Sequence, residues 1–239
     1  MRRTLTLISV PVCALVLLSG CGLASRGPVI SGPVVSEERS IDVASSVVLD
    51  SWGDLTIREG EPSLVIHAPA AVLKRLTAEV NDGELVLGVK PGSPMISNVR
   101  VEYELTVPSL DGIEISGSGS VDSDVPGDDL TVDISGSGDV DIDSIDASSV
   151  TLDLSGSGDI RFSGRADELT VSIDGSGDVR AETLRTARAV VDIAGSGDVA
   201  VLASDRLEAS ISGSGSVTYD GNPEVTQDIS GSGDISPRN

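Results

Sequence analysis

The sequence predicts an all-β protein: a parallel β-helix, or solenoid, of about seven coils with 18–20 residues in each coil. Two observations carry this prediction. Runs of alternating apolar and polar residues, such as residues 150–155, recur at a nearly constant interval, and a fixed period of this length is typical of a solenoid. Each run ends in the phrase Gly-Ser-Gly, which stands at residues 117–119, 136–138, 156–158, 175–177, 195–197, 213–215 and 231–233.

Each repeat is expected to hold two strands joined by two corners. The alternating residues are mostly β-branched, which is typical of half-buried strands, and a propeller blade would need about twice this length. The two glycines around each serine favour a corner, because glycine takes positive φ without a Cβ clash. A second, less regular corner is expected at residues 143–144, 163–165, 203–205 and 220–223. Strands of successive coils would then pair in parallel, about 4.8 Å apart.

Three columns of residues are expected to point into the core. The first column precedes the Gly-Ser-Gly corner and contains Ile115, Ile134, Leu154, Ile173, Ile193, Ile211 and Ile229. The second lies two residues earlier and contains Ile113, Val132, Leu152, Val171, Val191 and Ala209. The third follows the corner and contains Val121, Val140, Ile160, Val179, Val199, Val217 and Ile235. Gln227 takes the second-column position in the seventh coil, so we expect a C-terminal cap to begin there.

Residues 1–20 are typical of a lipoprotein signal peptide. A basic start, Arg2 and Arg3, precedes an apolar segment that is short for a membrane-spanning helix. The end of the segment, Leu18-Ser-Gly-Cys21, resembles the lipobox of bacterial lipoproteins. This resemblance implies that Cys21 is lipidated, for example with palmitate, and that the protein is exported and membrane-anchored in the bacterial cell envelope. The alternative is an ordinary secretory signal with a chance cysteine.

The composition argues against nucleic acid as a partner. The chain has 38 Asp and Glu residues against 16 Lys and Arg, a net charge of −22, and loss of residues 1–20 would remove two arginines and no acid. Such an acidic surface repels nucleic acid and anionic lipid headgroups. Cys13 would leave with the signal and Cys21 would be acylated, so the mature domain would hold no thiol for a disulfide, a metal site or a nucleophile.

The remaining chain divides into a tether and one domain. Residues 21–40 are expected to form the lipidated cysteine and a flexible tether, because they are rich in glycine, proline and serine. Residues 41–235 are expected to form a single domain, in which 41–111 make an N-terminal cap with irregular coils and 112–235 make the regular repeats. The sequence Asn81-Asp-Gly83 predicts a hairpin, and residues 70–76 are expected to make one helical turn.

The repeats resemble a known family. The strand-rich lead-in, the sequence from Val107 to Val121 and its later echoes resemble the head GIN domain family of auto-transporter adhesins, over about residues 41–235. The resemblance implies the same β-helical fold and an adhesin-like role in the cell envelope. It implies no catalytic residue.

The residue types available argue against an enzyme. His67 is the one histidine, and the Gly-Ser-Gly corners lack the strand–turn–helix context of a nucleophile. Carboxylates are common, but the aromatic residues that could stack on sugars are Trp52, Tyr103, Phe162 and Tyr219 alone. We expect a lipid-anchored, surface-exposed, non-catalytic scaffold that binds the membrane through its lipid and an extracellular protein or glycan. The alternative is a carbohydrate-binding or carbohydrate-active β-helix enzyme.

One set of residues is a candidate cation site. Asp139, Asp159, Asp178 and Asp198 follow successive corners, so their carboxylates would stack about 5 Å apart. Like charges at that spacing repel by roughly 3 kcal/mol at an effective dielectric constant of about 20. The aspartates would relieve this repulsion by pointing into solvent, by accepting hydrogen bonds within their own corners, or by sharing Ca²⁺ ions. No other cofactor is expected.

Overall fold

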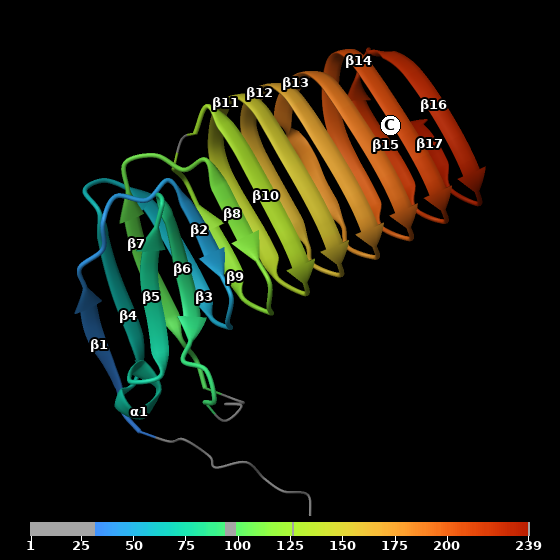
Figure 1. Cartoon of the computed structure of the whole chain (residues 1–239). Coiled ribbons are helices and arrows are strands. Elements are labelled where there is room, and N and C mark those ends of the chain that lie inside the picture. The colour runs from blue at the N-terminus through green and yellow to red at the C-terminus, as the bar shows by residue number, and fades with distance from the viewer. Residues whose placement is uncertain (1–31, 94–98, 126, 239) are drawn as a thin grey trace, which may run out of the picture.

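The structure, a computed structural model, describes residues 32–93, 99–125 and 127–238. The regular coils form an elongated stack of parallel strands, which confirms the predicted all-β solenoid of about seven turns (Figure 1). Its strands are β8 (Gly112–Ile115), β9 (Ser120–Ser123), β10 (Asp129–Gly136), β11 (Asp139–Gly156), β12 (Ile160–Gly175), β13 (Val179–Gly195), β14 (Asp198–Gly213), β15 (Ser216–Gly221), β16 (Glu224–Gly231) and β17 (Asp234–Pro237).

The coils build two sheets that meet at the Gly-Ser-Gly corner. The first sheet contains the strand segments before the corner, from β8 and β10 to β16, and the second sheet contains the segments after it, from β9 to β15 and β17. The register keeps equivalent residues side by side: Ile134 pairs with Ile115 in one direction and with Leu154 in the other. Residues at equivalent positions of successive repeats therefore lie side by side in the sheet.

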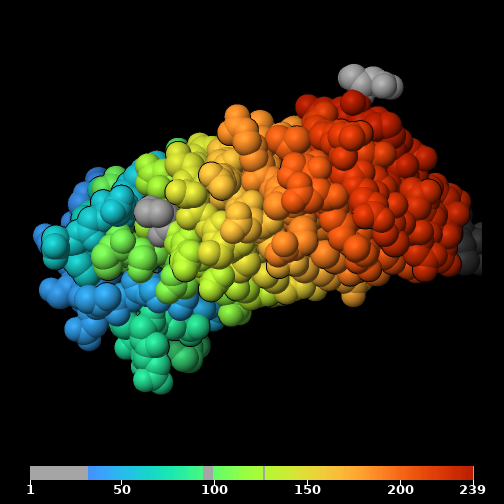
Figure 2. Space-filling view, turned by 90° about the horizontal axis from the view of Figure 1, so that it is seen from above, coloured from blue at the N-terminus to red at the C-terminus, as the bar shows by residue number. Residues whose placement is uncertain are grey.

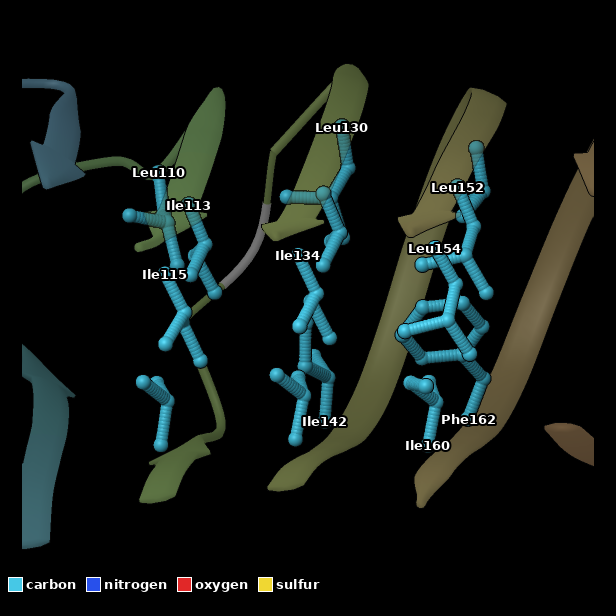
Figure 3. Packing of buried hydrophobic residues seen from close by; sticks show 14 of the residues in the cluster. Leu110, Ile113, Ile115, Leu130, Ile134, Ile142, Leu152, Leu154, Ile160 and Phe162 are labelled. Carbon is cyan, nitrogen blue, oxygen red and sulfur yellow. The ribbon is translucent and has the colours of Figure 1, made fainter. Parts of the chain in front are cut away.

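The three predicted inward columns are confirmed. All their members up to Val217 are buried, with at most 2% of their surface exposed. Figure 3 shows Leu154, Ile160 and Phe162 pointing toward one another within one layer of the core. In the last coil Ile229 is 39% exposed and Gln227 is exposed, so both lie at the open end of the stack.

The Gly-Ser-Gly corners need glycine for the predicted reason at their first position, and for a second reason that was not predicted. The first glycine has positive φ at five corners, for example 158° at Gly156 and 146° at Gly231, whereas the second glycine, such as Gly158, is not among the residues with positive φ. The second reason is close stacking: the Gly136 carbonyl oxygen accepts a hydrogen bond from the Ser157 N–H at 3.0 Å. A Cβ on Gly156 would collide with that same oxygen.

In strands β11 to β14 the second corner is a bend, whereas between β15 and β16 it is a break in the strand. Strand β11 continues through it, with Ser144 at a φ of 62°, and β12 does so with Gly164 at 125°. Register shifts occur in this region between β11 and β12, β12 and β13, and β13 and β14. Differences in coil length are therefore absorbed at the second corner.

The N-terminal cap does not follow chain order. Strands β2 (Ser46–Leu49) and β3 (Asp54–Glu59) form a coil directly against β8 and β9. Strands β6 (Glu84–Val89) and β7 (Glu102–Val107), which come later in the chain, stack on the outer side of that coil. The first coil in the chain is therefore the second in the stack, with parallel pairing on both sides.

Antiparallel strands close the N-terminal end. Strand β4 (Ser63–Pro69) pairs with β7 and with β1 (Val34–Arg39), and β5 (Leu76–Asn81) pairs with β6. The β5–β6 hairpin and the single helical turn α1 (Ala70–Leu73) confirm two predictions. The tether prediction was wrong for residues 34–39, because β1 continues the second sheet along β4.

The described residues are held together by one hydrophobic cluster. Its buried members lie between Ala44 and Val217, so a form of the protein that begins at Gly22 keeps the whole described core. Figure 2 shows the resulting elongated body, with the cap at one end and the last coils at the other. Cys21 and the predicted signal peptide lie outside the described residues. Within the described part, no helix is long and apolar enough to cross a membrane.

Candidate functional site: the aspartate face

The residues that follow the corners form one column on the outside of the second sheet. Ser120 pairs with Asp139, and Asp198 pairs with Ser216, which pairs with Asp234 in turn. We call this outer surface of the second sheet the aspartate face. The four predicted aspartates, Asp139, Asp159, Asp178 and Asp198, are therefore brought to one surface, as their spacing suggested.

The column also contains a residue that the repeat pattern missed. Asp54 begins β3 and pairs with Ser120, whose hydroxyl donates a hydrogen bond to the Asp54 Oδ1 at 2.8 Å. The corner before it reads Asp-Ser-Trp-Gly rather than Gly-Ser-Gly. The available signal was the sequence after that corner, because Gly53-Asp-Leu repeats the glycine, aspartate and apolar residue of the later coils.

Backbone groups of the next coil neutralise part of the negative charge. The Asp139 Oδ1 accepts a hydrogen bond from the Asp159 N–H at 2.9 Å, and the Asp198 Oδ1 accepts one from the Ser216 N–H at 3.0 Å. The Asp178 Oδ1 accepts the equivalent bond from Asp198 at 3.3 Å. These three aspartates thus link successive coils, whereas hydrogen bonds within each corner were one of the alternatives considered from the sequence.

Arginines provide the remaining compensation. The two terminal nitrogens of Arg180 lie 3.5 Å from the Asp159 carboxylate and 3.4 Å from that of Asp178, which places one cation between two members of the column. The Arg161 guanidinium lies 2.9 Å from Asp141. Arg161, Arg180 and the carboxylates of Asp141 and Asp159 line an open groove of about 320 Å³ together with Asp54.

The calcium hypothesis is not tested by this geometry. Within residues 32–93, 99–125 and 127–238, no three His, Cys, Asp or Glu side chains are grouped so as to hold a metal ion. Binding of Ca²⁺ by Asp139, Asp159, Asp178 and Asp198 therefore stays a prediction. Any such site would compete with the N–H groups and the Arg180 guanidinium that these carboxylates already contact.

A smaller acidic strip lies on the outside of the first sheet. Asp133 pairs with Glu114 on one side and with Asp153 on the other. Partial burial raises the pKa of Asp133, and the negative charges of Asp153 and Glu114 raise it further. Here the like charges of stacked coils are not separated as they are on the aspartate face.

His67 lies in the cap rather than in the groove. Its Nδ1 lies 2.9 Å from the Ser36 hydroxyl of β1, and its Nε2 lies 3.4 Å from a carboxylate oxygen of Glu104 on β7. The imidazole therefore connects the three strands of the cap in the second sheet. Two of the four aromatic residues with a potential sugar-stacking role, Tyr103 and Phe162, are buried in the core.

The family assignment follows from the sequence match. A family model described as "putative auto-transporter adhesin, head GIN domain" matches residues 45–223, well over half of the chain. The chain belongs to the head GIN domain family. The matched region runs from the residue before β2 to the residue before β16, so it contains the aspartate face from Asp54 to Ser216. No curated protein matches the chain.

Solved structures share the fold of this head GIN domain protein. A "putative adhesin" from Bacteroides fragilis NCTC 9343 has a TM-score of 0.80 at 23% identity, over 87% of this chain and 98% of that one. A "putative lipid binding protein" from Parabacteroides distasonis ATCC 8503 has a TM-score of 0.72 at 23% identity, with the same coverage. A "putative adhesin" from Parabacteroides merdae ATCC 43184 has a TM-score of 0.66 at 20% identity, over 87% and 97%. Similarity at these identities shows the fold, and the family supports an adhesin-like or binding role at the cell envelope.

Proposed function

We propose that this head GIN domain protein is a lipid-anchored, surface-exposed scaffold that binds an extracellular partner without catalysis. The observation that carries the proposal is the aspartate face, where stacked coils hold charged side chains at fixed intervals through hydrogen bonds and ion pairs between coils. Such a surface is ordered before any partner arrives, which lowers the entropic cost of binding. Adhesin-like relatives support the same role.

The position of the predicted anchor favours a surface role. Cys21 precedes β1, and β1 lies at the cap end of the stack, opposite β16 and β17 (Figure 1). The twelve residues between Cys21 and Val34 could span about 40 Å when extended. A lipid on Cys21 would therefore hold the cap near the membrane, while the regular coils extend away from it.

The side chains of the described residues favour binding over catalysis. The histidine contacts cap residues, and burial prevents Tyr103 and Phe162 from serving as sugar-stacking platforms. The groove instead presents carboxylates and guanidinium groups that already pair with one another. These charged groups are exposed, so they can form ion pairs with a polar ligand instead of with one another, and no buried charge is left unpaired.

Lipid anchoring is tested by substitution of the two cysteines. Cys21→Ser should abolish incorporation of radiolabelled palmitate and transfer the protein from the detergent phase to the aqueous phase. Cys13→Ser is the matched control, because this cysteine lies within the predicted signal peptide and should not affect labelling. Equal labelling of the Cys21→Ser protein and the natural protein would contradict the anchor.

The binding role is tested with the form that begins at Gly22. We expect it to bind a subset of extracellular-matrix proteins or glycans on an array, and Arg180→Gln to weaken that binding. Arg206→Gln removes the same charge on the first sheet, where Arg206 pairs with Glu208, and should leave binding unchanged. Absence of binding on every array, or equal loss in both variants, would refute a binding role for the aspartate face.

A further inference from the structure

A second depression lies at the irregular corner, away from the aspartate face. It has a volume of about 710 Å³ and is lined by residues from β12, β13 and β14 and by Gly221 and Asn222. We call it the corner groove. Its neighbouring coils are in register, since Arg165 pairs with Arg185, and Arg185 pairs with Leu202. Four successive coils therefore contribute to one continuous surface.

Irregular coil length positions the side chains of the groove. Ala181 pairs with Val201 and Arg185 pairs with Leu202, so three residues of β13 have no counterpart in β14. One of these three, Leu184, fills the core and is fully buried. The bulge thus brings Arg185 beside Leu202 while the core remains filled. Small buried residues, Ala166 and Ala203, are among those that line the groove.

Two positive charges stand side by side in this groove. Arg165 and Arg185 are both exposed and are direct neighbours across the β12–β13 pair. Eight of the eleven arginines in the described part form ion pairs, but Arg165 and Arg185 form none with another described residue. Like charges directly opposite each other in a sheet are unfavourable. This pair is therefore an exception in a chain with 38 acidic residues.

Two of the other polar groups of the groove are already engaged. The Thr186 hydroxyl donates a hydrogen bond to the Leu202 carbonyl oxygen at 2.8 Å, and the Ser204 hydroxyl donates one to Asp205 at 2.8 Å. Asp167 lies on the rim, but it is not within ion-pair distance of either guanidinium among the described contacts. The groups left to recognise a ligand are the two guanidinium forks, with the Asp167 carboxylate and the Asn222 amide beside them.

Guanidinium groups recognise oxyanions in a specific geometry. Each fork can donate two parallel hydrogen bonds to a carboxylate or a phosphate, and such charge-assisted bonds are stronger than neutral ones. An anion between Arg165 and Arg185 would also remove their mutual repulsion. We propose that the corner groove binds a ligand that carries a carboxylate or phosphate group, held by Arg165 and Arg185. The proposal does not depend on the lipid anchor or on the aspartate face.

The test uses the form that begins at Gly22 and three sugar probes that differ in charge. Glucuronate carries a carboxylate, glucose 6-phosphate carries a phosphate, and glucose carries neither. NMR shifts of the arginine Nε–H signals report contact directly, and calorimetry gives the Kd. We expect saturable shifts of the Arg165 and Arg185 signals with one or both charged probes and none with glucose. The two charged probes distinguish a carboxylate site from a phosphate site.

Substitutions separate a specific site from the general field of the protein. Arg165→Gln and Arg185→Gln should each raise the Kd at least tenfold, and Arg185→Lys should also weaken binding because it keeps the charge but loses the fork. Arg188→Gln is the matched control: it removes the same charge from the same strand, but Arg188 pairs with Glu168. The control should change the Kd less than about twofold. The proposal is overturned if neither charged probe gives saturable shifts, or if Arg188→Gln weakens binding as much as Arg185→Gln.

Discussion

Substitution of a corner glycine gives the sharpest test of how the coils stack. In Gly156→Ala the new Cβ would collide with the Gly136 oxygen and lie 2.9 Å from the Gly136 carbonyl carbon. Two carbon atoms in contact prefer a separation of about 3.5–4.0 Å, so the two coils would have to move apart by roughly 1 Å. The hydrogen bond from Ser157 to the Gly136 oxygen, now 3.0 Å long, would then be broken.

The expected cost combines two effects. Forcing an extra methyl group into a closely packed site costs about 1–3 kcal/mol, and leaving the corner hydrogen-bonding groups without partners costs about 1–3 kcal/mol more. We therefore expect Gly156→Ala to lower the free energy of unfolding by about 2–6 kcal/mol. Gly83→Ala should cost only about 1 kcal/mol, because Gly83 has a φ of 84° but nothing lies within 4 Å of its Cβ position.

Urea unfolding of the form that begins at Gly22, followed by circular dichroism, would measure these differences. Ser157→Ala is the matched control in the same corner, because the Ser157 side chain is exposed and should contribute less than about 0.5 kcal/mol. The stacking argument fails if Gly156→Ala costs no more than Gly83→Ala, or if Gly156→Ala and Ser157→Ala have the same small effect.

Three further predictions concern the core and the charged surfaces. Ile173→Ala should lower the free energy of unfolding in urea by about 2–5 kcal/mol. Ile229→Ala should lower it clearly less, because Ile229 is 39% exposed, and equal losses would contradict the position of Ile229 at the open end of the stack. The raised pKa of Asp133 means that the folded protein binds this proton more tightly than the unfolded chain, so stability falls as pH rises through the folded pKa. Asp133→Asn should therefore raise the unfolding midpoint at pH 7 and lose this advantage below pH 3.8, and a lower midpoint at pH 7 would contradict the assignment. If the aspartate column binds calcium, Ca²⁺ should raise the melting temperature more than Mg²⁺ or NaCl at equal ionic strength, and Asp159→Asn with Asp178→Asn should remove the difference; equal effects of all three salts would indicate screening alone.

The regular part of the fold could be predicted because each coil repeats the same physical requirements. Alternation fixes which residues point inward, and the constant Gly-Ser-Gly phrase fixes where the coils align, so the columns that contain Ile173 and Val179 follow directly. Of the two reasons for the corner glycines, positive φ could be predicted from the sequence, but close stacking could not. Positive φ is a property of one residue, whereas the contact between Gly156 and the Gly136 oxygen depends on the neighbouring coil.

The cap could be predicted only in part, because its strands are not placed by a repeat. The hairpin between β5 and β6 follows from local turn residues, which act over a few positions. The insertion of β2 and β3 between the coil of β6 and β7 and the coil of β8 and β9 depends on contacts far apart in sequence. For the same reason the place of Asp54 in the aspartate column was missed.

The corner groove illustrates how the least regular part of a repeat can carry the residues that recognise a ligand. The intervals from Gly175 to Gly195 and from Gly195 to Gly213 are 20 and 18 residues, yet the glycines pair in register. The difference in coil length must therefore be accommodated elsewhere in the coil. The second corner can accommodate it, because no stacked Gly-Ser-Gly contact fixes the position of the backbone there. A bulge at that corner can change which side chains meet, as it does for Arg185, without disturbing the inward columns. Changes in sequence at the second corner can thus alter the recognition of a ligand at low cost in stability. The same changes at a Gly-Ser-Gly corner would separate the coils.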